Sequence, residues 1–289
     1  MNTLQTNSVL PLVSQLRSSY PALQQVLQAP FQLNLIIDTN VILGDMLWML
    51  KKRRNANAKT EILELLQNRT LFACAPTLLK KEIKRHIPVI AKKEGLDEGA
   101  FLCLWKEYER YIEFLPYKTS QKLRKQCERD PNDAPFLALQ MSHRYPIHSK
   151  DKDMVAMGGK VINARLITDL KEYSRNAEIC YSFEISGIGI GILTISTARA
   201  IFVLLSKIPK QIYAGAAIGL FVLLLHPKSR EQILKCIESN MKGISAALEE
   251  AANMISPSLE KYNQSRNIVE DKKELIIGQL AGQGLQFRR

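Results

Sequence analysis

The sequence predicts an α/β fold in which a central parallel sheet lies between two layers of helices, followed by an all-α C-terminal region. Short apolar runs at residues 33–37, 71–75 and 146–149 alternate with stretches of helical periodicity. This alternation favours parallel strand pairing with helices on both faces of the sheet. After Lys171 the composition changes to long apolar stretches and then to an amphipathic helical one, which favours a separate all-α region.

Helix signals follow the expected strands. Helical spacing is present at 41–50, 61–67, 77–93 and 133–141. The pattern between residue 77 and Cys127 is helical throughout, with breaks only at Gly95 and Pro116. The sequence therefore predicts strand, loop and helix units, with a mainly helical segment before the last strand.

The length of 289 residues exceeds that of a typical single domain and suggests one domain of catalytic size plus a second region. We expect four parts, which are an irregular, partly helical lead-in at 1–30, an α/β domain at 31–165, a hydrophobic helical hairpin at 166–230, and amphipathic helices with a basic tail at 231–289.

The formal net charge is +12, and basic residues cluster at 51–54, 80–85 and 122–125. Such clusters are typical of proteins that bind a phosphate backbone, although solvated helix faces or attraction to anionic lipid would also explain them. The five cysteines form no CxxC pair, which favours a reduced, cytosolic setting. The four histidines show no metal-ligand spacing, so any metal is expected to have oxygen ligands.

Acidic residues stand where the predicted elements begin or end. Asp38 and Asp151 each follow a predicted strand, Asp133 precedes a predicted helix, and Glu82 falls on or beside the apolar stripe of another helix. In parallel sheets, ligands bind beyond the carboxyl ends of the strands. Hydrolysis of phosphodiesters by two metal ions needs several carboxylates, because Mg2+ prefers hard oxygen ligands.

Each acid also has a structural explanation when it is taken alone. Asp38 and Asp133 would serve as helix N-caps, and Glu82 would pair with Arg85 or Lys81 on the helix rim. Asp151 and Asp153 would belong to a solvated loop. The joint placement of four acids at the ends of elements is what favours a catalytic site.

At these positions the sequence resembles the PIN domain family. The segment Leu35 to Leu43, which contains Asp38-Thr39-Asn40, is similar to the family's opening strand, and Ala75 to His86 is similar to its second acidic motif. Asp130 to Leu139 resembles the third motif, and Lys150 to Met154 resembles the fourth. The resemblance covers about residues 31–165 and implies a PIN-like three-layer α/β/α fold.

The resemblance implies a nuclease that hydrolyses RNA with Mg2+ or Mn2+. It makes Asp38, Glu82, Asp133 and Asp151 the catalytic acids and metal ligands, Asp153 an auxiliary ligand, and Thr39 and Asn40 supporting residues. We expect the nucleic acid to be bound by Lys80, Lys81, Lys84, Arg85 and Lys150. Lys150 stands where the family often has a small residue, which predicts that it competes with a metal.

Two long apolar stretches, 185–205 and 212–225, predict a helical hairpin. The first is long enough to span a bilayer, and its glycines would allow close helix packing. Arg199 opposes this reading, as do Lys207 and Lys210 in the turn. We expect membrane association through residues 185–226, with a cytoplasmic nuclease domain. The alternative is a soluble chain in which the hairpin forms the core of a homo-oligomer.

The sequence thus predicts a divalent-metal-dependent endoribonuclease that is tethered or oligomerised by its C-terminal part. In a bacterial setting, the resemblance implies a toxin, defence or RNA-processing role, the first with an antitoxin-like partner. The alternative, from a different class, is a catalytically silent PIN-like module that binds RNA or protein at the membrane. A receiver-like fold with Asp38 as phospho-acceptor is a third interpretation, but no acidic pair precedes the acceptor strand.

Overall fold

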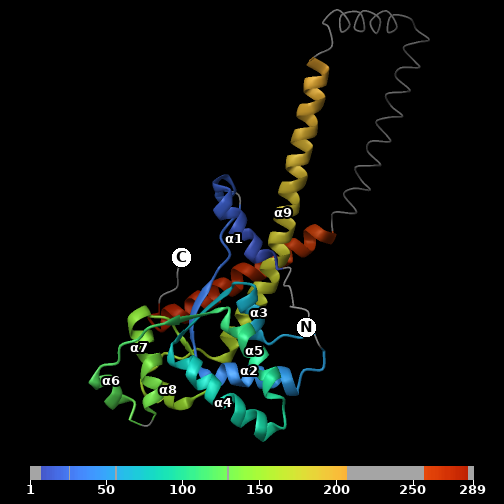
Figure 1. The fold of residues 1–289 in the computed structure, drawn as a ribbon. Coiled ribbons are helices and arrows are strands. Elements are labelled where there is room, and N and C mark those ends of the chain that lie inside the picture. Colours follow the sequence, from blue (N-terminus) through green and yellow to red (C-terminus); the bar gives the residue numbers. More distant parts are fainter. Residues whose placement is uncertain (1–7, 26, 56, 129, 207–256, 286–289) are drawn as a thin grey trace, which may run out of the picture. The chain divides into compact units, whose positions relative to one another are not determined.

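The computed structural model describes residues 8–25, 27–55, 57–128, 130–206 and 257–285. Its elements up to the sheet's last strand, in chain order, are α1 (Val9–Ser19), η1 (Pro21–Gln25), β1 (Leu33–Ile37), α2 (Thr39–Lys51), α3 (Glu61–Gln67), β2 (Leu71–Pro76), α4 (Leu78–Glu94), α5 (Glu98–Glu109), β3 (Ile112–Leu115), α6 (Gln121–Gln126), η2 (Pro131–Asp133), α7 (Ala134–His143) and β4 (Ile147–His148). They are followed by α8 (Lys152–Ala156), α9 (Ala164–Ser206) and a helix at 257–282 (Figure 1).

The centre of the fold is a four-stranded parallel sheet with the strand order β3-β2-β1-β4. All five residues of β1 are buried, because this strand has neighbours on both sides and helices flank the sheet. Helix α7 packs against β1 and β2, and α4 packs against β2 while it contacts α2 and α5. The predicted α/β class with a central parallel sheet is confirmed.

The strand β3 differs from the sequence prediction, which extended helical patterning through this segment. Ile112–Leu115 instead pairs with β2, where Ala73 lies opposite Ile112 and Pro76 opposite Leu115. A run of four residues that ends just before Pro116 carries too little periodicity to distinguish a strand from a helix end. The neighbouring β2 supplies the hydrogen bonds that decide its conformation.

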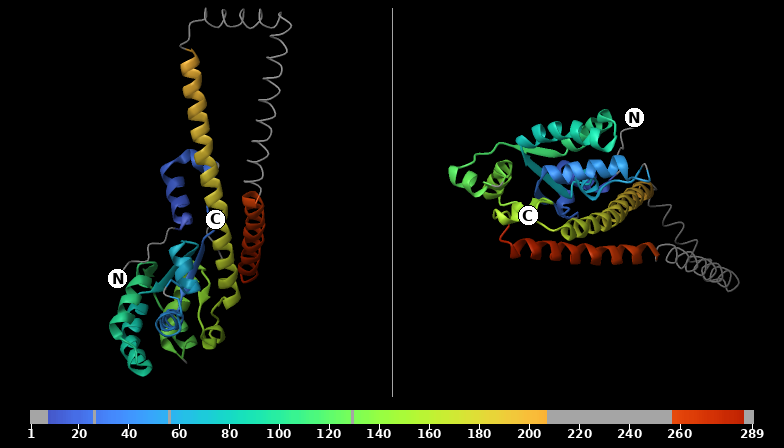
Figure 2. Two further views of the ribbon diagram at one scale, coloured as in Figure 1. Left: turned by 90° about the vertical axis from the view of Figure 1, so that its right-hand side faces the viewer. Right: turned by 90° about the horizontal axis from the view of Figure 1, so that it is seen from below.

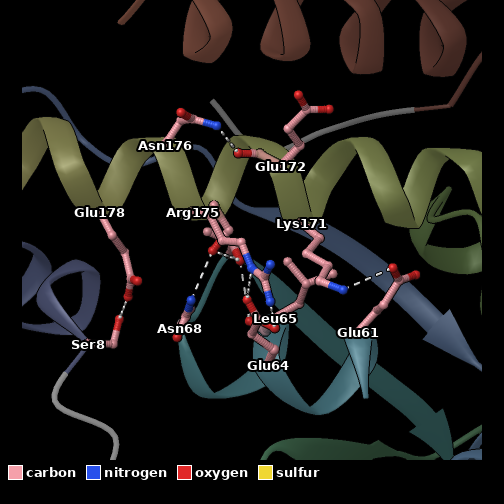
Figure 3. Close-up of polar contacts among 12 residues, drawn as sticks. Ser8, Glu61, Glu64, Leu65, Asn68, Lys171, Glu172, Arg175, Asn176 and Glu178 are labelled. Atoms are coloured by element: carbon pink, nitrogen blue, oxygen red, sulfur yellow. Dashed lines mark hydrogen bonds and ion pairs between the residues drawn. The ribbon is translucent and has the colours of Figure 1, made fainter. Parts of the chain in front are cut away.

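The base of α9, residues 164–181, is joined to α3 by ion pairs. The Arg175 guanidinium donates two hydrogen bonds to the Glu64 carboxylate, at 2.6 and 2.8 Å, and Lys171 Nζ lies 3.1 Å from Glu61 Oε1 (Figure 3). Beneath them, the buried Asn68 donates a hydrogen bond to Ser174. A two-pronged arginine–carboxylate pair fixes orientation as well as distance, so these contacts hold α9 to the sheet domain.

The chain divides into two compact units, one comprising residues 1–181 and 265–289 and the other residues 182–264. The expected boundary at 165/166 therefore falls inside α9, a single helix that begins at Ala164. In the second unit, the Phe183 and Tyr262 rings stack with centroids 5.0 Å apart, and Tyr262 donates a hydrogen bond to Glu184.

The end of the C-terminal helix belongs to the first unit. Ile276 and Leu280 are fully buried, and Lys272 Nζ lies 2.7 Å from Asp169 and 2.8 Å from Glu172 of α9. Figure 2 shows this helix, coloured red, beside the basal part of α9. The sheet domain is therefore completed by a segment about a hundred residues later in the chain.

The predicted hydrophobic hairpin is described only in part. Its first stretch, 185–205, continues α9 without a break, whereas the turn and the second stretch, 212–225, lie outside the described residues. Residues 231–256 of the predicted amphipathic region and the Arg288-Arg289 tail also lie outside them. Within the described ranges, no helix is long and apolar enough to cross a membrane.

Because Leu280 is fully buried, we expect Leu280→Ala to lower the free energy of unfolding by about 2–5 kcal/mol. Leu275 on the same helix is 40% exposed, and Leu275→Ala serves as the control, with an expected change within about 0.5 kcal/mol. Urea unfolding followed by circular dichroism measures both changes. Equal, small effects would show that the C-terminal helix does not contribute to the core of the first unit.

A candidate acidic active site at the end of the sheet

Asp38 lies where β1 leaves the sheet. It occupies the N-cap position of α2, yet its side chain makes no capping hydrogen bond with that helix. Its Oδ2 instead accepts a hydrogen bond from Ser149 Oγ, beyond the end of β4. Burial raises the pKa of Asp38, and the hydrogen bond from Ser149 together with the backbone N–H groups of Thr39 and Asn40 partly opposes this rise. The side-chain partner of this carboxylate therefore comes from the loop after β4.

Glu82 projects from α4 and is buried. Its Oε2 accepts a hydrogen bond of 2.6 Å from Thr39 Oγ1 at the start of α2. Among the described residues Glu82 forms no ion pair at contact distance, although the nearby charge of Arg85 helps to lower its pKa. Its direct partner is Thr39 rather than Arg85 or Lys81. Burial raises its pKa, and the nearby charge of Asp38 adds to this effect.

Asp133 occupies the N-cap position of α7 without capping it. The residue is buried, and its Oδ2 has no hydrogen-bond partner. Burial raises its pKa to about 7, helped by the negative charges of Asp130, Asp38, Asp151 and Glu82. An unpartnered buried oxygen beside four other acids is costly unless a cation joins them.

Asp151 comes from the loop after β4 and is half-buried. Unlike Asp38 and Asp133, it does cap a helix, because its Oδ1 accepts a hydrogen bond of 2.8 Å from the Asp153 backbone. Its own backbone N–H donates to Ser149 Oγ at 2.9 Å. Ser149 therefore links Asp151 to Asp38.

Asn40 of α2 forms two hydrogen bonds with the loop after β4. Its Nδ2 donates to Ser149 Oγ at 3.3 Å, and its Oδ1 accepts from the Lys150 backbone at 3.2 Å. Sequence reasoning named Asn40 as a supporting residue but missed Ser149. The one available signal was a hydroxyl residue directly after a predicted strand, beside the candidate acid Asp151.

One cavity of about 380 Å3 gathers the four predicted acids. Its lining comprises Asp38, Thr39, Asn40, Leu43, Glu82, Arg85, His86, Asp130, Asn132, Asp133, Phe136 and Asp151. The cavity lies beyond the ends of β1 and β4, where the strand order changes direction. Open α/β sheets bind their ligands at such a switch point.

Of the predicted auxiliary and basic residues, only some line the acidic cavity. Asp153 is exposed and does not line the acidic cavity. Lys80 lies 3.0 Å from Glu109 and over the Phe114 ring, which gives it a structural role. Lys81 and Lys84 are exposed on α4, whereas Arg85 lines the cavity.

Lys150 does not enter the acidic cavity. Its Nζ lies 2.7 Å from the position that a Cβ on Gly44 would occupy, and the residue lines a different cavity on the other side of α2. The prediction that Lys150 competes with a metal is therefore wrong for this arrangement. In the loop after β4, Ser149 and Lys150 line the larger cavity, whereas Asp151 lines the acidic one.

Comparison with protein families finds a match to the PIN domain over residues 36–174. The chain carries a PIN domain. Members of this family are generally nucleases and typically use Mg2+ or Mn2+. No curated protein and no solved structure matched the chain.

The PIN domain of this chain offers oxygen atoms suited to a hard divalent cation. The four acids supply carboxylate oxygens, burial and the neighbouring negative charges raise the pKa of Asp133, and one of its buried oxygens lacks a partner. Within the described ranges, however, no three acidic, histidine or cysteine side chains are spaced to hold one ion as they stand. Thr39 and Ser149 hold Glu82 and Asp38 through hydroxyl groups, so metal binding would need these side chains to turn.

The raised pKa of Asp133 predicts how stability depends on pH. Because the folded state favours the protonated form, the contribution of Asp133 is fully present below about pH 4 and is lost as pH rises through about 7. In EDTA, we expect the melting temperature to fall between about pH 5 and about pH 8. Asp133→Asn should flatten this fall, and Glu113→Gln on β3 is the control. The same slope in all three proteins would contradict the assignment.

Proposed function

We propose that the PIN domain of this chain is a divalent-metal-dependent endoribonuclease. In this proposal the carboxylates of Asp38, Glu82, Asp133 and Asp151 hold Mg2+ or Mn2+. The observation that carries it is their convergence on one cavity at the switch point of the sheet, where Asp133 has a pKa of about 7. Perturbed acids gathered in one cleft are typical of functional sites.

The bound cation would supply the Lewis acidity that activates water and stabilises charge on a phosphodiester. The residues of the chain prepare the site for it. Thr39 and Ser149 orient the carboxylates of Glu82 and Asp38 by hydrogen bonds, and Asn40 fixes the loop that carries Asp151. These hydrogen bonds keep the carboxylates at the cavity, and Glu82 and Asp38 would turn from their hydroxyl donors to bind the cation.

Substrate binding would rely on the basic residues beside the cavity. Arg85 lines it, and Lys81 and Lys84 are exposed on the same helix. A guanidinium at the rim matches a phosphate with two parallel donors. The net charge of +12 supports attraction of a polyanion, and the family supports a nuclease. RNA rather than DNA as the substrate is the finer part of the proposal.

One observation favours the alternative of a binding module without catalysis. The described acidic side chains are not spaced to hold one ion as they stand. If they cannot turn toward a cation, the basic rim would still bind RNA. Cleavage and binding must therefore be measured separately.

The test uses the full chain with end-labelled single-stranded RNA and, in parallel, DNA of the same sequence. We expect cleavage of RNA with Mn2+ or Mg2+ and none with EDTA. Asp38→Asn and Asp133→Asn should each lose at least about a hundredfold in rate, since metal stabilisation is worth several kcal/mol. Glu113→Gln removes an exposed carboxylate on β3 and should cleave normally.

Circular dichroism checks that each variant is folded, so that lost activity is not lost structure. Binding of RNA without cleavage by the folded wild type, under every metal condition, would sink the nuclease proposal and support the binding module. Preferential cleavage of DNA would keep the nuclease but correct its substrate.

A further inference from the structure

A second and larger cavity lies on the other side of α2 from the acidic one. Its volume is about 680 Å3, within the range of small-molecule sites. It is bounded by α2, the segment that leads into α3, the end of β4 and the base of α9. Its polar and aromatic lining includes Asp45, Trp48, Lys59, His148, Lys150 and Lys171.

The two cavities adjoin each other at the loop after β4. Ser149 lines the larger cavity, while its hydroxyl donates to Asp38 of the acidic one. Lys150 and Asp151, which follow in sequence, line the larger and the acidic cavity respectively. A ligand that crosses this loop would therefore reach both cavities.

Lys150 places a positive charge on the wall of this cavity, where it acts on the buried Asp45 carboxyl and partly opposes the rise in the pKa of Asp45 that burial causes. Within the described part of the chain, its ammonium has no hydrogen-bond or ion-pair partner. The Lys150 side chain lies against Gly44, where a Cβ would come within 2.7 Å of Nζ and would push the end of this flexible side chain aside. Of the other lysines of the cavity, Lys59 donates a hydrogen bond to Gln67. Lys171 pairs with Glu61 (Figure 3). The Lys150 ammonium can thus reach a ligand without breaking a hydrogen bond, although the ligand shares its charge with Asp45.

The remaining lining suits a planar, polar group. The Trp48 side chain is 38% exposed, which leaves ring surface for stacking. The His148 imidazole is buried, and its Nδ1 has no partner among the described residues. Asn163 adds a hydrogen-bonding side chain to the wall, whereas the Thr60 hydroxyl is already bonded to Tyr108 and to the Leu63 backbone. An ammonium without a hydrogen-bond partner, an accessible indole and an unsatisfied imidazole nitrogen match a phosphate joined to a base.

We propose that this cavity binds one nucleotide unit of the RNA, adjacent to the bond held at the acidic cavity. This assignment rests on the proposed function, because it takes the bound polymer to be the substrate. Lys150 contacts the phosphate and Trp48 stacks on the base, while the loop 149–151 carries the chain from one cavity to the other. Free nucleotides share this chemistry, so the experiment includes them.

The experiment follows tryptophan fluorescence of the full chain in EDTA, which prevents cleavage. Of the two tryptophans, Trp105 is 1% exposed, so a ligand in the cavity acts on Trp48. A short oligoribonucleotide and adenosine 5′-monophosphate are titrated, with adenosine and inorganic phosphate as fragments. We expect saturable quenching by the oligonucleotide, weaker quenching by the monophosphate, and no signal in Trp48→Phe.

Two variants test the phosphate contact, and one is the control. Lys150→Ala should weaken binding of the oligonucleotide about tenfold or more, because it removes a charge-assisted hydrogen bond. Gly44→Ala only pushes Nζ aside at the end of a flexible side chain, and alanine is compatible with the helix, so it should weaken binding less than Lys150→Ala does. Lys118→Ala removes an exposed charge next to β3, at the far edge of the sheet, and should bind normally.

The outcomes separate this proposal from the nuclease. Absence of quenching, or equal binding by Lys150→Ala and Lys118→Ala, overturns the nucleotide site even if RNA is cleaved. Quenching by the monophosphate that the oligonucleotide does not compete for shows a free-nucleotide site and overturns the RNA assignment. Quenching by the oligonucleotide without cleavage under any metal condition supports RNA binding here and overturns the nuclease. In an active enzyme, Lys150→Ala should raise KM more than it lowers kcat.

Discussion

The parallel pairing of β1 with both β2 and β4 is the constraint on which the rest of the structure depends. It brings the carboxyl ends of β1 and β4 together at the switch point of the sheet. Asp38 and Asp151, more than a hundred residues apart, thereby reach one cavity. The pairing of β1 with β4 also places Ser149 beside Asp38. The register of the two strands therefore determines this hydrogen bond of the site.

The buried carboxylates of the acidic cavity lower the stability of the domain. Burial and mutual repulsion raise the pKa of Asp38, Glu82 and Asp133, so each charge costs folding free energy at neutral pH. Hydroxyl donors compensate the first two, and Asp133 keeps an unpartnered oxygen. Violations of ordinary packing rules are expected where function requires them, and here they point to a cation.

The base of α9 connects the site with distant parts of the chain. It contributes Lys171 to the larger cavity, pairs with α3 through Arg175, and receives Lys272 from the C-terminal helix. A fragment that ends soon after the PIN domain would therefore expose the surfaces that Ile276 and Leu280 cover. This coupling explains why activity and binding are best measured on the full chain.

The α/β class, the strand at 33–37 and the acids that follow strands or begin helices could be predicted from the sequence, because these depend on local periodicity and position. That Asp133 does not cap its helix, that Ser149 is the side-chain donor to Asp38, and that residues 112–115 form a strand depends on contacts made in the folded domain. The tertiary structure also directed Lys150 away from the acids. These features depend on residues that lie far away in the sequence. The local sequence therefore does not predict which donor a side chain will bind or which cavity it will line.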